Sequence, residues 1–338
     1  MKGNGSEWLY LGVDVGGTKV QASVVRESGE ILARQRCQTP RNEEPERELC
    51  AIESVIEDAL TASKKKLRDV QAIGIAIPGV VAPRQGRIVV TPNMNLSGVR
   101  ISKHLRRRFG VPVAVGNDCN LGALGERWLG AARDAKSAFT ILVGTGVGGG
   151  FVRKGKLWRG AREAASEIGH IVMQIGGPVC GCGNRGCLEA LASRTAIERD
   201  LREAVNGGRS SMVTELTGGD LTVIRSRVLC KALEAGDSLV TEVMQRAAEV
   251  LGYACLTVRH LIDPEVIVLG GGVIEACGDF VVPIVRQIVE ADRLPGAREG
   301  GRVVVSALGD DAVVLGAVAL ARATAGRNPF GKRACVAT

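Results

Sequence analysis

Runs of apolar residues divide the first part of the chain into strands and one helix. A turn formed by Gly16, Gly17 and Thr18 separates the first two strand-like runs, and the helical stretch has its apolar residues at the spacing of one helix face. The predicted strands lie at residues 9–15, 20–25, 29–38 and 72–79, and the predicted helix lies at residues 47–66. Three short strands, a helix and a further parallel strand are typical of an α/β protein.

The second half of the chain repeats this pattern. Residues 138–160 have the pattern of a strand, a glycine turn and a second strand. A long helical stretch at 237–262 leads into the apolar run 266–274, a strand that ends in three glycines before a helix-like run. Residues 310–323 are predicted to form a closing helix. Two related α/β lobes with an active-site cleft between them are therefore expected.

The length of the chain fits this two-lobed fold. A single core stops growing at about 250–300 residues, whereas this chain has 338. We expect an N-terminal lobe at residues 1–120, with the helix at 310–323 packed back on it, and a C-terminal lobe at residues 121–309. Aromatic residues make up only 3% of the chain and glycines number 45, so Val, Ile, Leu and Ala must build the cores.

The net charge of +8 is spread along the chain. Basic runs such as Lys64–Lys66 and Arg106–Arg108 fall on helical stretches, where a solvated helix face is a simpler interpretation than a nucleic-acid surface. The first residues lack the charged and apolar regions of a signal peptide, and no uncharged apolar run approaches the roughly 20 residues of a membrane span. We therefore expect a cytoplasmic protein without a nucleic-acid or membrane partner.

Three of the ten cysteines, Cys180, Cys182 and Cys187, lie within eight positions among glycines. In a reducing compartment such a cluster favours metal ligation over disulfides. A structural zinc site takes four ligands, and among the three histidines His170 is the obvious fourth, because it lies ten positions before Cys180. The sequence therefore predicts a structural Zn²⁺ site of the Cys₃His type in a loop of the C-terminal lobe.

Glycine turns stand at the ends of three predicted strands, and backbone N–H groups in such turns bind phosphate. The turns are Gly16, Gly17 and Thr18, then Gly144, Thr145 and Gly146, and then Gly270, Gly271 and Gly272. Each alone is more often an ordinary tight turn. None fits the P-loop pattern, and the G-x-G-x-x-G dinucleotide-binding form is not cleanly met. Together with Asp14 they indicate a nucleotide held between the lobes.

Six motifs follow one another along the chain: DVGGTK at 14–19, GND at 116–118, GTGVGGG at 144–150, EIGH at 167–170, CGCGNRGCLE at 180–189 and VIVLGGG at 266–272. In these motifs and in their order the chain resembles the ROK family. ROK proteins are sugar kinases, glucokinases among them, and related repressors of the actin-like, hexokinase-type ATPase superfamily. The resemblance runs from about residue 9 to residue 323 and implies the two-lobed actin-like ATPase (ribonuclease H-like) fold.

The resemblance also implies roles for individual residues. It makes Asp118 the general base that takes the proton of a hexose hydroxyl while that oxygen attacks the γ-phosphorus of ATP. A helix N-cap or Asx turn is the alternative interpretation of Asn117 and Asp118. The three glycine turns and Asp14 are assigned to ATP, and Asp14 also to Mg²⁺. The implied sugar contacts are Asn93, Asn117, Asp118, Glu167, His170 and Glu189.

The resemblance further connects the zinc site with the sugar. Zinc would hold one ring nitrogen of His170 and leave the other for a sugar hydroxyl, and Cys187 would place Glu189 two residues further on. One position departs from the family, because Ser166 stands where glycine commonly precedes the EIGH motif. This departure bears on the identity of the sugar and leaves the phosphoryl-transfer groups intact.

Two functions from different classes fit these motifs. The first is an ATP:hexose 6-kinase, with glucose favoured over N-acetylhexosamines, mannose, fructose and allose. The second is a ROK regulator that senses sugar without turning it over. Regulators carry a helix-turn-helix domain before the first glycine turn, and only 13 residues precede Asp14, so the kinase is favoured. The family also leads us to expect a homo-oligomer, either a dimer or a tetramer.

Overall fold

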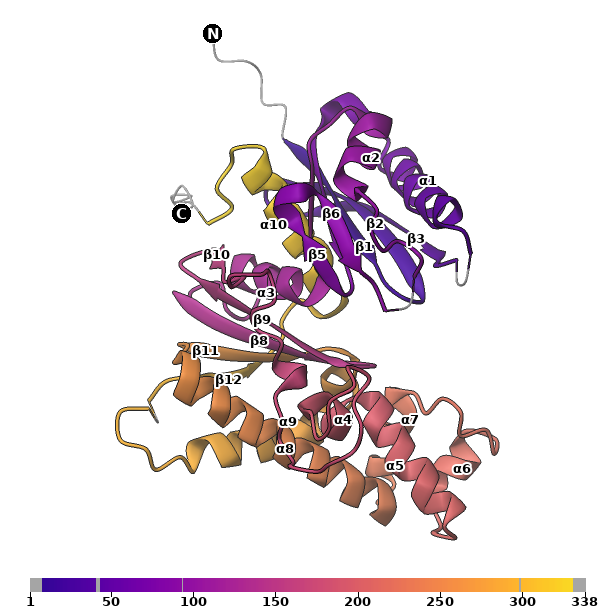
Figure 1. Ribbon diagram of the computed structural model, residues 1–338, viewed down its shortest axis with the longest axis vertical. Helices are drawn as coiled ribbons and strands as arrows, with labels where there is room; N and C mark the ends of the chain where they lie inside the picture. The colour runs from indigo at the N-terminus through magenta and orange to yellow at the C-terminus, as the bar shows by residue number, and fades with distance from the viewer. Residues whose placement is uncertain (1–7, 41–42, 93, 298, 331–338) are drawn as a thin grey trace. The chain divides into compact units, whose positions relative to one another are not determined.

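A computed structural model describes residues 8–40, 43–92, 94–297 and 299–330 (Figure 1). The described chain forms two compact units. Unit 1 runs to Asp134 and adds Val152–Ala165 and the segment from Asp310 onward, whereas unit 2 consists of Ala135–Phe151 and Ser166–Gly309. The expected boundary at residue 120 lies inside helix α3 (Asp118–Trp128), which belongs to unit 1.

Unit 1 is built on a five-stranded sheet of order β3-β2-β1-β4-β7. Strands β1, β2 and β3 pair antiparallel, and β4 and β7 continue the sheet parallel to β1. The strands are β1 (Leu9–Val15), β2 (Lys19–Arg26), β3 (Ile31–Gln38), β4 (Val70–Ile77) and β7 (Val113–Asn117), with a separate hairpin of β5 (Val80–Ala82) and β6 (Arg87–Val90). The predicted order of three strands, a helix and a parallel strand is confirmed.

Helices cover both faces of this sheet. Successive strand residues point to opposite faces, so neighbouring residues pack against different helices. Leu11 and Ile75 belong to the core that the sheet forms with α1 (Pro45–Ser63) and α2 (Ile101–Phe109). Gly12 and Gly74 lie on the other face, against α10 (Ala312–Thr324), which also packs on α3. A Cβ atom on Gly74 would lie 1.8 Å from the carbonyl oxygen of Ala317. Glycine at this position therefore allows α10 to approach the sheet.

A second five-stranded sheet has the order β10-β9-β8-β11-β12. Strands β8, β11 and β12 and most of β9 belong to unit 2, whereas β10 lies in the Val152–Ala165 segment of unit 1. Phe139 and Ile141 of β8 and Ile267 and Leu269 of β11 point into one core, which they share with the helices. The strands are β8 (Ser137–Val143), β9 (Val147–Arg153), β10 (Lys156–Leu157), β11 (Val266–Gly270) and β12 (Arg302–Val305). The helices are α4 (Leu188–Ala192), α5 (Arg194–Asn206), α6 (Met212–Leu216), α7 (Ser226–Glu234), α8 (Ser238–Ile262) and α9 (Gly272–Glu290).

The predicted strand that ends in three glycines before a helical run is confirmed, because β11 ends at Gly270 and α9 begins at Gly272. Gly271 between them has φ 87° and ψ 165°, a conformation that essentially only glycine adopts. A Cβ atom on Gly271 would lie 2.7 Å from the carbonyl oxygen of Val143. The predicted glycine turn thus forms the sharp connection between β11 and α9.

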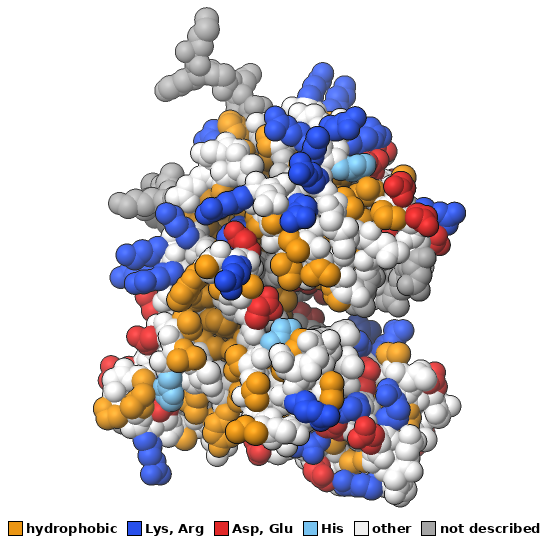
Figure 2. Space-filling view, in the orientation of Figure 1, with side chains coloured by type: hydrophobic (Ala, Val, Ile, Leu, Met, Phe, Trp, Pro, Cys, Tyr) orange, Lys and Arg blue, Asp and Glu red, His pale blue; other side chains and the backbone are white. Residues whose placement is uncertain are grey.

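Some of the positive charge is paired locally. On α2, Arg108 forms ion pairs with Glu53 and Glu57 of α1, and the Nε2 atom of His104 lies 2.6 Å from Glu53 Oε1. On the face drawn in Figure 2, Lys and Arg side chains occur on both units and are interspersed with Asp and Glu. None of the helices in the described segments combines the length and the apolar character that crossing a membrane requires.

Replacing Gly74 with alanine is expected to destabilise unit 1, because the new methyl group would overlap the backbone of α10. Overpacking of this kind costs about 1–3 kcal/mol. Thermal and urea unfolding of Gly74→Ala would measure the loss. Gly278→Ala in α9 is the matched control, since its nearest neighbours would lie at an ordinary 3.8 Å and alanine favours helix. Equal stability of the two variants would contradict the close approach of α10.

Candidate functional site

Parallel strands bring Asp14, Asn117 and Asp118 to one edge of the unit 1 sheet. Asp14 is paired with Ala76 of β4, and Ala76 is paired with Gly116 of β7, one residue before Asn117. The carboxyl ends of β1, β4 and β7 therefore meet at this edge, which is where open α/β sheets bind their ligands. The first glycine turn follows β1 at the same edge.

The first glycine turn is held by a residue that sequence analysis did not single out. The N–H of Gly16 donates to the carbonyl oxygen of Lys19 at 2.9 Å, which closes the turn. Thr39, directly after β3, donates its hydroxyl to Gly16 O at 2.6 Å and its N–H to Thr18 O at 3.0 Å. Only the pairing of β2 with β3 brings Thr39 here, so no local signal in the sequence marks it.

Asn117 and Asp118 have different structural roles at the start of α3. Asn117 is the N-cap of α3, and its Oδ1 accepts from Asn120 N at 3.0 Å. Its Nδ2 donates to Gly79 O and to Asp118 Oδ1, each at 3.0 Å. Asp118 Oδ1 also accepts from Cys119 N at 2.8 Å. The cap predicted as an alternative thus exists, and it is Asn117, which orients the Asp118 carboxylate.

Asp14 lies in an environment that favours a bound cation. Burial raises the pKa of Asp14 to about 7, and Asp118 acts in the same direction through its negative charge. Lys19 and Arg36 lower the pKa, whereas Asp310 raises it. A desolvated carboxylate with a second one nearby suits Mg²⁺, which binds oxygen ligands through one or two carboxylates.

The second and third glycine turns share one edge of the unit 2 sheet. Strands β8 and β11 are parallel, and Gly270 is paired with Leu142, two residues before Gly144. Within the second turn, the N–H of Gly144 donates to Gly146 O at 2.9 Å. Gly270, Gly271 and Gly272 connect β11 to the first residue of α9. The two turns predicted to bind ATP are therefore neighbours in the fold of unit 2.

Glu189 connects the cysteine loop to the second glycine turn. Its Oε2 accepts from the N–H of Val147 at 3.0 Å, and its Oε1 lies 3.6 Å from Cys180 Sγ. A Cβ atom on Gly146 would lie only 2.4 Å from Glu189 Oε2, so the absent side chain makes room for the carboxylate. Cys187 is the N-cap of α4 and thereby places Glu189 in the first turn of that helix.

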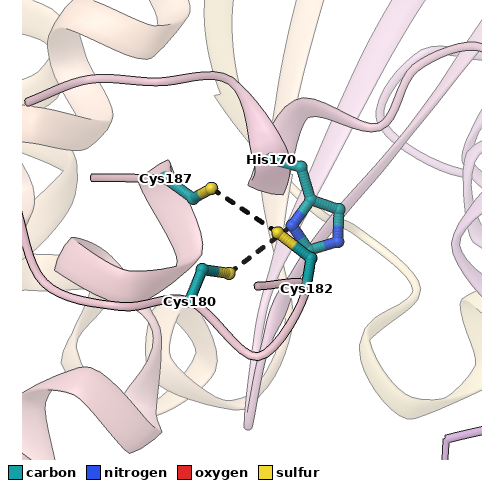
Figure 3. A group of neighbouring side chains, drawn as sticks. All are labelled: His170, Cys180, Cys182 and Cys187. Carbon is teal, nitrogen blue, oxygen red and sulfur yellow. Dashed lines mark hydrogen bonds between the residues drawn. The ribbon is translucent and has the colours of Figure 1, made fainter. Parts of the chain in front are cut away.

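His170 and three cysteines converge in one loop of unit 2 (Figure 3). Their candidate ligand atoms all lie within 4.8 Å of one another. His170 Nδ1 lies 3.7 Å from Cys180 Sγ, and the Sγ atoms of Cys182 and Cys187 are 3.8 Å apart. His170 ends a short 3₁₀ turn that runs from Ile168. Three sulfur atoms and one nitrogen form a donor set that could hold a zinc ion.

Burial and hydrogen bonding shift the pKa values of several groups around this loop. Burial raises the pKa of the Cys180 and Cys187 thiols, whereas a hydrogen bond from the backbone of Asn184 lowers the pKa of Cys182. Burial also raises the pKa of Glu167, although His170 opposes this change. Asn93, another predicted sugar contact, lies outside the described residues.

Ser166, the position that departs from the family motif, has a strained backbone. Its φ is 70°, in the left-handed region that favours glycine. Its carbonyl oxygen accepts from the N–H of Ile168 at 2.7 Å, which starts the turn that carries His170. The conformation gives a physical reason for glycine at this position, because glycine adopts it without steric cost.

Comparison with known proteins finds relatives of two kinds, kinases and repressors. The ROK family model matches residues 10–324. The chain is 35% identical over 312 residues to a glucokinase of Halalkalibacterium halodurans, covering 92% of this chain and 94% of that protein. It is 30% identical over 312 residues to the N-acetylglucosamine repressor of Escherichia coli O6:H1, covering 92% of this chain and 75% of the repressor.

A solved structure has the same fold. It is the crystal structure of a ROK family glucokinase from Streptomyces griseus in complex with glucose and AMPPNP. The TM-score is 0.82 at 31% identity, and the match covers 93% of this chain and 99% of that chain. The expected α/β fold of the actin-like ATPase type is therefore confirmed.

Replacing Ser166 with glycine is expected to stabilise the protein slightly. Glycine avoids the roughly 1–2 kcal/mol that an L side chain costs in the left-handed region, less about 0.4–1 kcal/mol for the freer unfolded chain. Ser166→Val should be clearly less stable, because a branched side chain is strained most at positive φ. Thermal unfolding midpoints of the three proteins test this order. A valine variant as stable as the glycine variant would contradict the observed backbone conformation.

Proposed function

The chain belongs to the ROK family, and from this premise we propose that it transfers the γ-phosphoryl group of ATP to the 6-hydroxyl of a hexose, with glucose as the first candidate. Glucokinase relatives and the fold shared with a glucose-bound and AMPPNP-bound glucokinase support this proposal. The observation that carries it is the Asp118 carboxylate, which Asn117 and the backbone of Cys119 hold beside Asp14 at the carboxyl edge of the sheet.

Asp118 acts as the general base. Its carboxylate accepts the proton of the 6-hydroxyl while that oxygen forms a bond to the γ-phosphorus, and the bond from this phosphorus to the bridging oxygen of ADP breaks. Such proton transfer contributes about 10²–10⁴-fold to a rate. The hydrogen bonds from Asn117 Nδ2 and Cys119 N to Oδ1 hold the carboxylate in one orientation, which reduces the reorganisation needed before proton transfer.

The glycine turns bind the nucleotide. Turns 16–18 and 144–146 would hold the phosphates through backbone N–H groups, and residues 270–272 would border the adenosine. Asp14 would hold Mg²⁺, which supplies positive charge that neutralises the phosphate oxygens during transfer. The desolvated carboxyl of Asp14 fits this role.

The hexose is bound by groups that present hydrogen-bond donors and acceptors to its hydroxyls. We assign Asn93, Asn117, Glu167, His170 and Glu189 to this role beside Asp118. In the structure the Nδ1 atom of His170 faces the cysteines, so Nε2 is the ring nitrogen assigned to the sugar. The amide of Asn117 already holds Asp118 and caps α3, which makes the orientation of Asp118 a second role for this residue.

A structural zinc ion would hold the loop that carries these groups. Zinc–sulfur bonds of about 2.3 Å in a tetrahedral site place neighbouring ligand atoms about 3.8 Å apart. The distances of 3.7 Å and 3.8 Å within the cluster match this spacing. His170, Cys180, Cys182 and Cys187 would be the ligands, and Glu189 would follow directly on the rigid loop.

The cytoplasmic location and the homo-oligomeric state remain predictions.

ADP release with Mg-ATP and a panel of hexoses tests the proposed activity. Wild type is expected to turn over glucose faster than mannose, fructose, allose or N-acetylhexosamines. Asp118→Asn should still bind sugar but lose at least about two orders of magnitude in kcat, because the amide cannot accept the proton. Asp134→Asn, at a largely exposed carboxylate of the same unit, is the control. A near-normal kcat in Asp118→Asn would remove this residue from the base role.

No turnover with any sugar of the panel, together with measurable sugar binding, would instead favour the regulator. The similarity to the N-acetylglucosamine repressor is the observation that supports this second function. N-acetylglucosamine is for this reason included among the sugars, both in the turnover assay and in a direct binding measurement.

Zinc content and the Cys182→Ser variant test the metal site. Elemental analysis is expected to find about one zinc per chain in wild type and little in the variant, because a serine hydroxyl is a poor replacement for a thiolate ligand. Loss of the metal should lower both the unfolding midpoint and the affinity for hexose. Cys50→Ser, at an exposed cysteine outside the cluster, is the control. Undiminished zinc or unchanged sugar affinity in Cys182→Ser would contradict the proposed link.

A further inference from the structure

Helix α5 begins directly against the second glycine turn and holds its carbonyl groups. The N–H of Arg194 donates to Gly144 O at 2.9 Å. Thr195 donates its hydroxyl to Thr145 O at 2.8 Å, and its N–H lies 3.4 Å from the same oxygen. Ser193 caps the helix by accepting from Ala196 N at 3.1 Å.

Because of these hydrogen bonds, the carbonyl groups of Gly144 and Thr145 point toward helix α5. The N–H groups of Arg194, Thr195 and Ala196 are already occupied, so the start of α5 does not itself form an anion site. The helix instead binds the carbonyl oxygens of Gly144 and Thr145, which would repel a phosphate if they faced it. The first turn of α5 thus binds the two carbonyl oxygens of the glycine turn that would otherwise repel an anionic ligand.

The side chain of Arg194 adds a second contact to the turn. Its Nη2 donates to Thr145 Oγ1 at 2.8 Å. A guanidinium group is only a donor, so the threonine hydroxyl must be the acceptor in this bond. The proton of that hydroxyl is then available for another acceptor. A phosphate oxygen bound at the turn is an acceptor of the required kind.

The guanidinium is kept beside the turn by a partly buried ion pair. Arg194 Nε lies 3.5 Å from Glu198 Oε1, one helical turn further along α5. The two side chains are 23% and 9% exposed, so this pair is screened less than a surface pair. Glu198 therefore limits the directions in which Arg194 can move away from Thr145.

We propose that Arg194 is a positioning residue for the phosphate donor: its guanidinium group orients the Thr145 hydroxyl toward a phosphate oxygen. The inference rests on the proposed kinase function and extends it, because the sequence motifs assign phosphate binding to the backbone of this turn alone. The simpler alternative is that Arg194 only compensates the charge of Glu198 and stabilises α5.

The experiment measures the dissociation constant of Mg-AMPPNP for wild type, Arg194→Ala, Thr145→Val and the double variant. Each single variant is expected to bind about tenfold more weakly, the equivalent of one charge-assisted hydrogen bond. The double variant should be little weaker than either, because both changes remove the same hydroxyl contact. The affinity for glucose should change less than about twofold. Arg209→Ala, at an exposed ion pair with Glu242, should bind like wild type.

Two results would overturn the inference. One is an Arg194→Ala variant that binds Mg-AMPPNP as tightly as wild type. The other is a double variant in which the two losses multiply, because Arg194 would then act independently of Thr145. If Arg194→Ala unfolds, Thr145→Ser and Thr145→Val provide the test, since only serine keeps a hydroxyl, and equal nucleotide affinity of these two would also overturn the inference.

The wild-type measurement separates this inference from the proposed function. A wild type that neither binds Mg-AMPPNP nor turns over any hexose would remove the kinase and the role of Arg194 with it. A wild type that binds Mg-AMPPNP and phosphorylates a hexose, beside an unaffected Arg194→Ala, would overturn the role of Arg194 alone.

Discussion

Parallel pairing of the central strands is the constraint on which both parts of the candidate site depend. In unit 1 the pairing of β1, β4 and β7 brings Asp14 and Asp118 to one sheet edge, although about a hundred residues separate them in the chain. In unit 2 the pairing of β8 with β11 does the same for two glycine turns. Parallel strands place their carboxyl ends together, so side chains and turns from distant segments become neighbours without any contact between them in sequence.

Hydrogen bonds from neighbouring residues hold the groups at these edges in place. Thr39 holds the first glycine turn, α5 holds the second, and Asn117 orients Asp118. Glu189 reaches from the cysteine loop to Val147. Sites that bind phosphate or transfer protons depend on such support, because a small displacement of a donor or a base lowers binding and rate steeply. The family membership and the support found around Asp118 point to the same conclusion, a hexose kinase.

Several features were accessible from the chain alone. The βββαβ order, the helix at α8 and the closing helix at α10 follow from the periodicity of apolar residues, and the structure has them with ends shifted by a few positions. The predicted end of the strand at three glycines also matches the structure, because the glycines that follow Leu269 form a turn and a helix start. The cysteine cluster was visible as well, since its three thiols lie within eight positions.

By itself, then, the sequence determined the elements, the motifs and the residue types of the site, because hydrogen bonds within a helix and ligand spacing within a loop act over short distances along the chain. Only the tertiary structure decided that Asn117 is the cap and Asp118 the oriented carboxylate, that Ser166 has positive φ, and that Thr39 and Arg194 contact glycine turns. These facts arise from strand register and helix docking, which depend on contacts between segments far apart in the chain and leave no local pattern to detect.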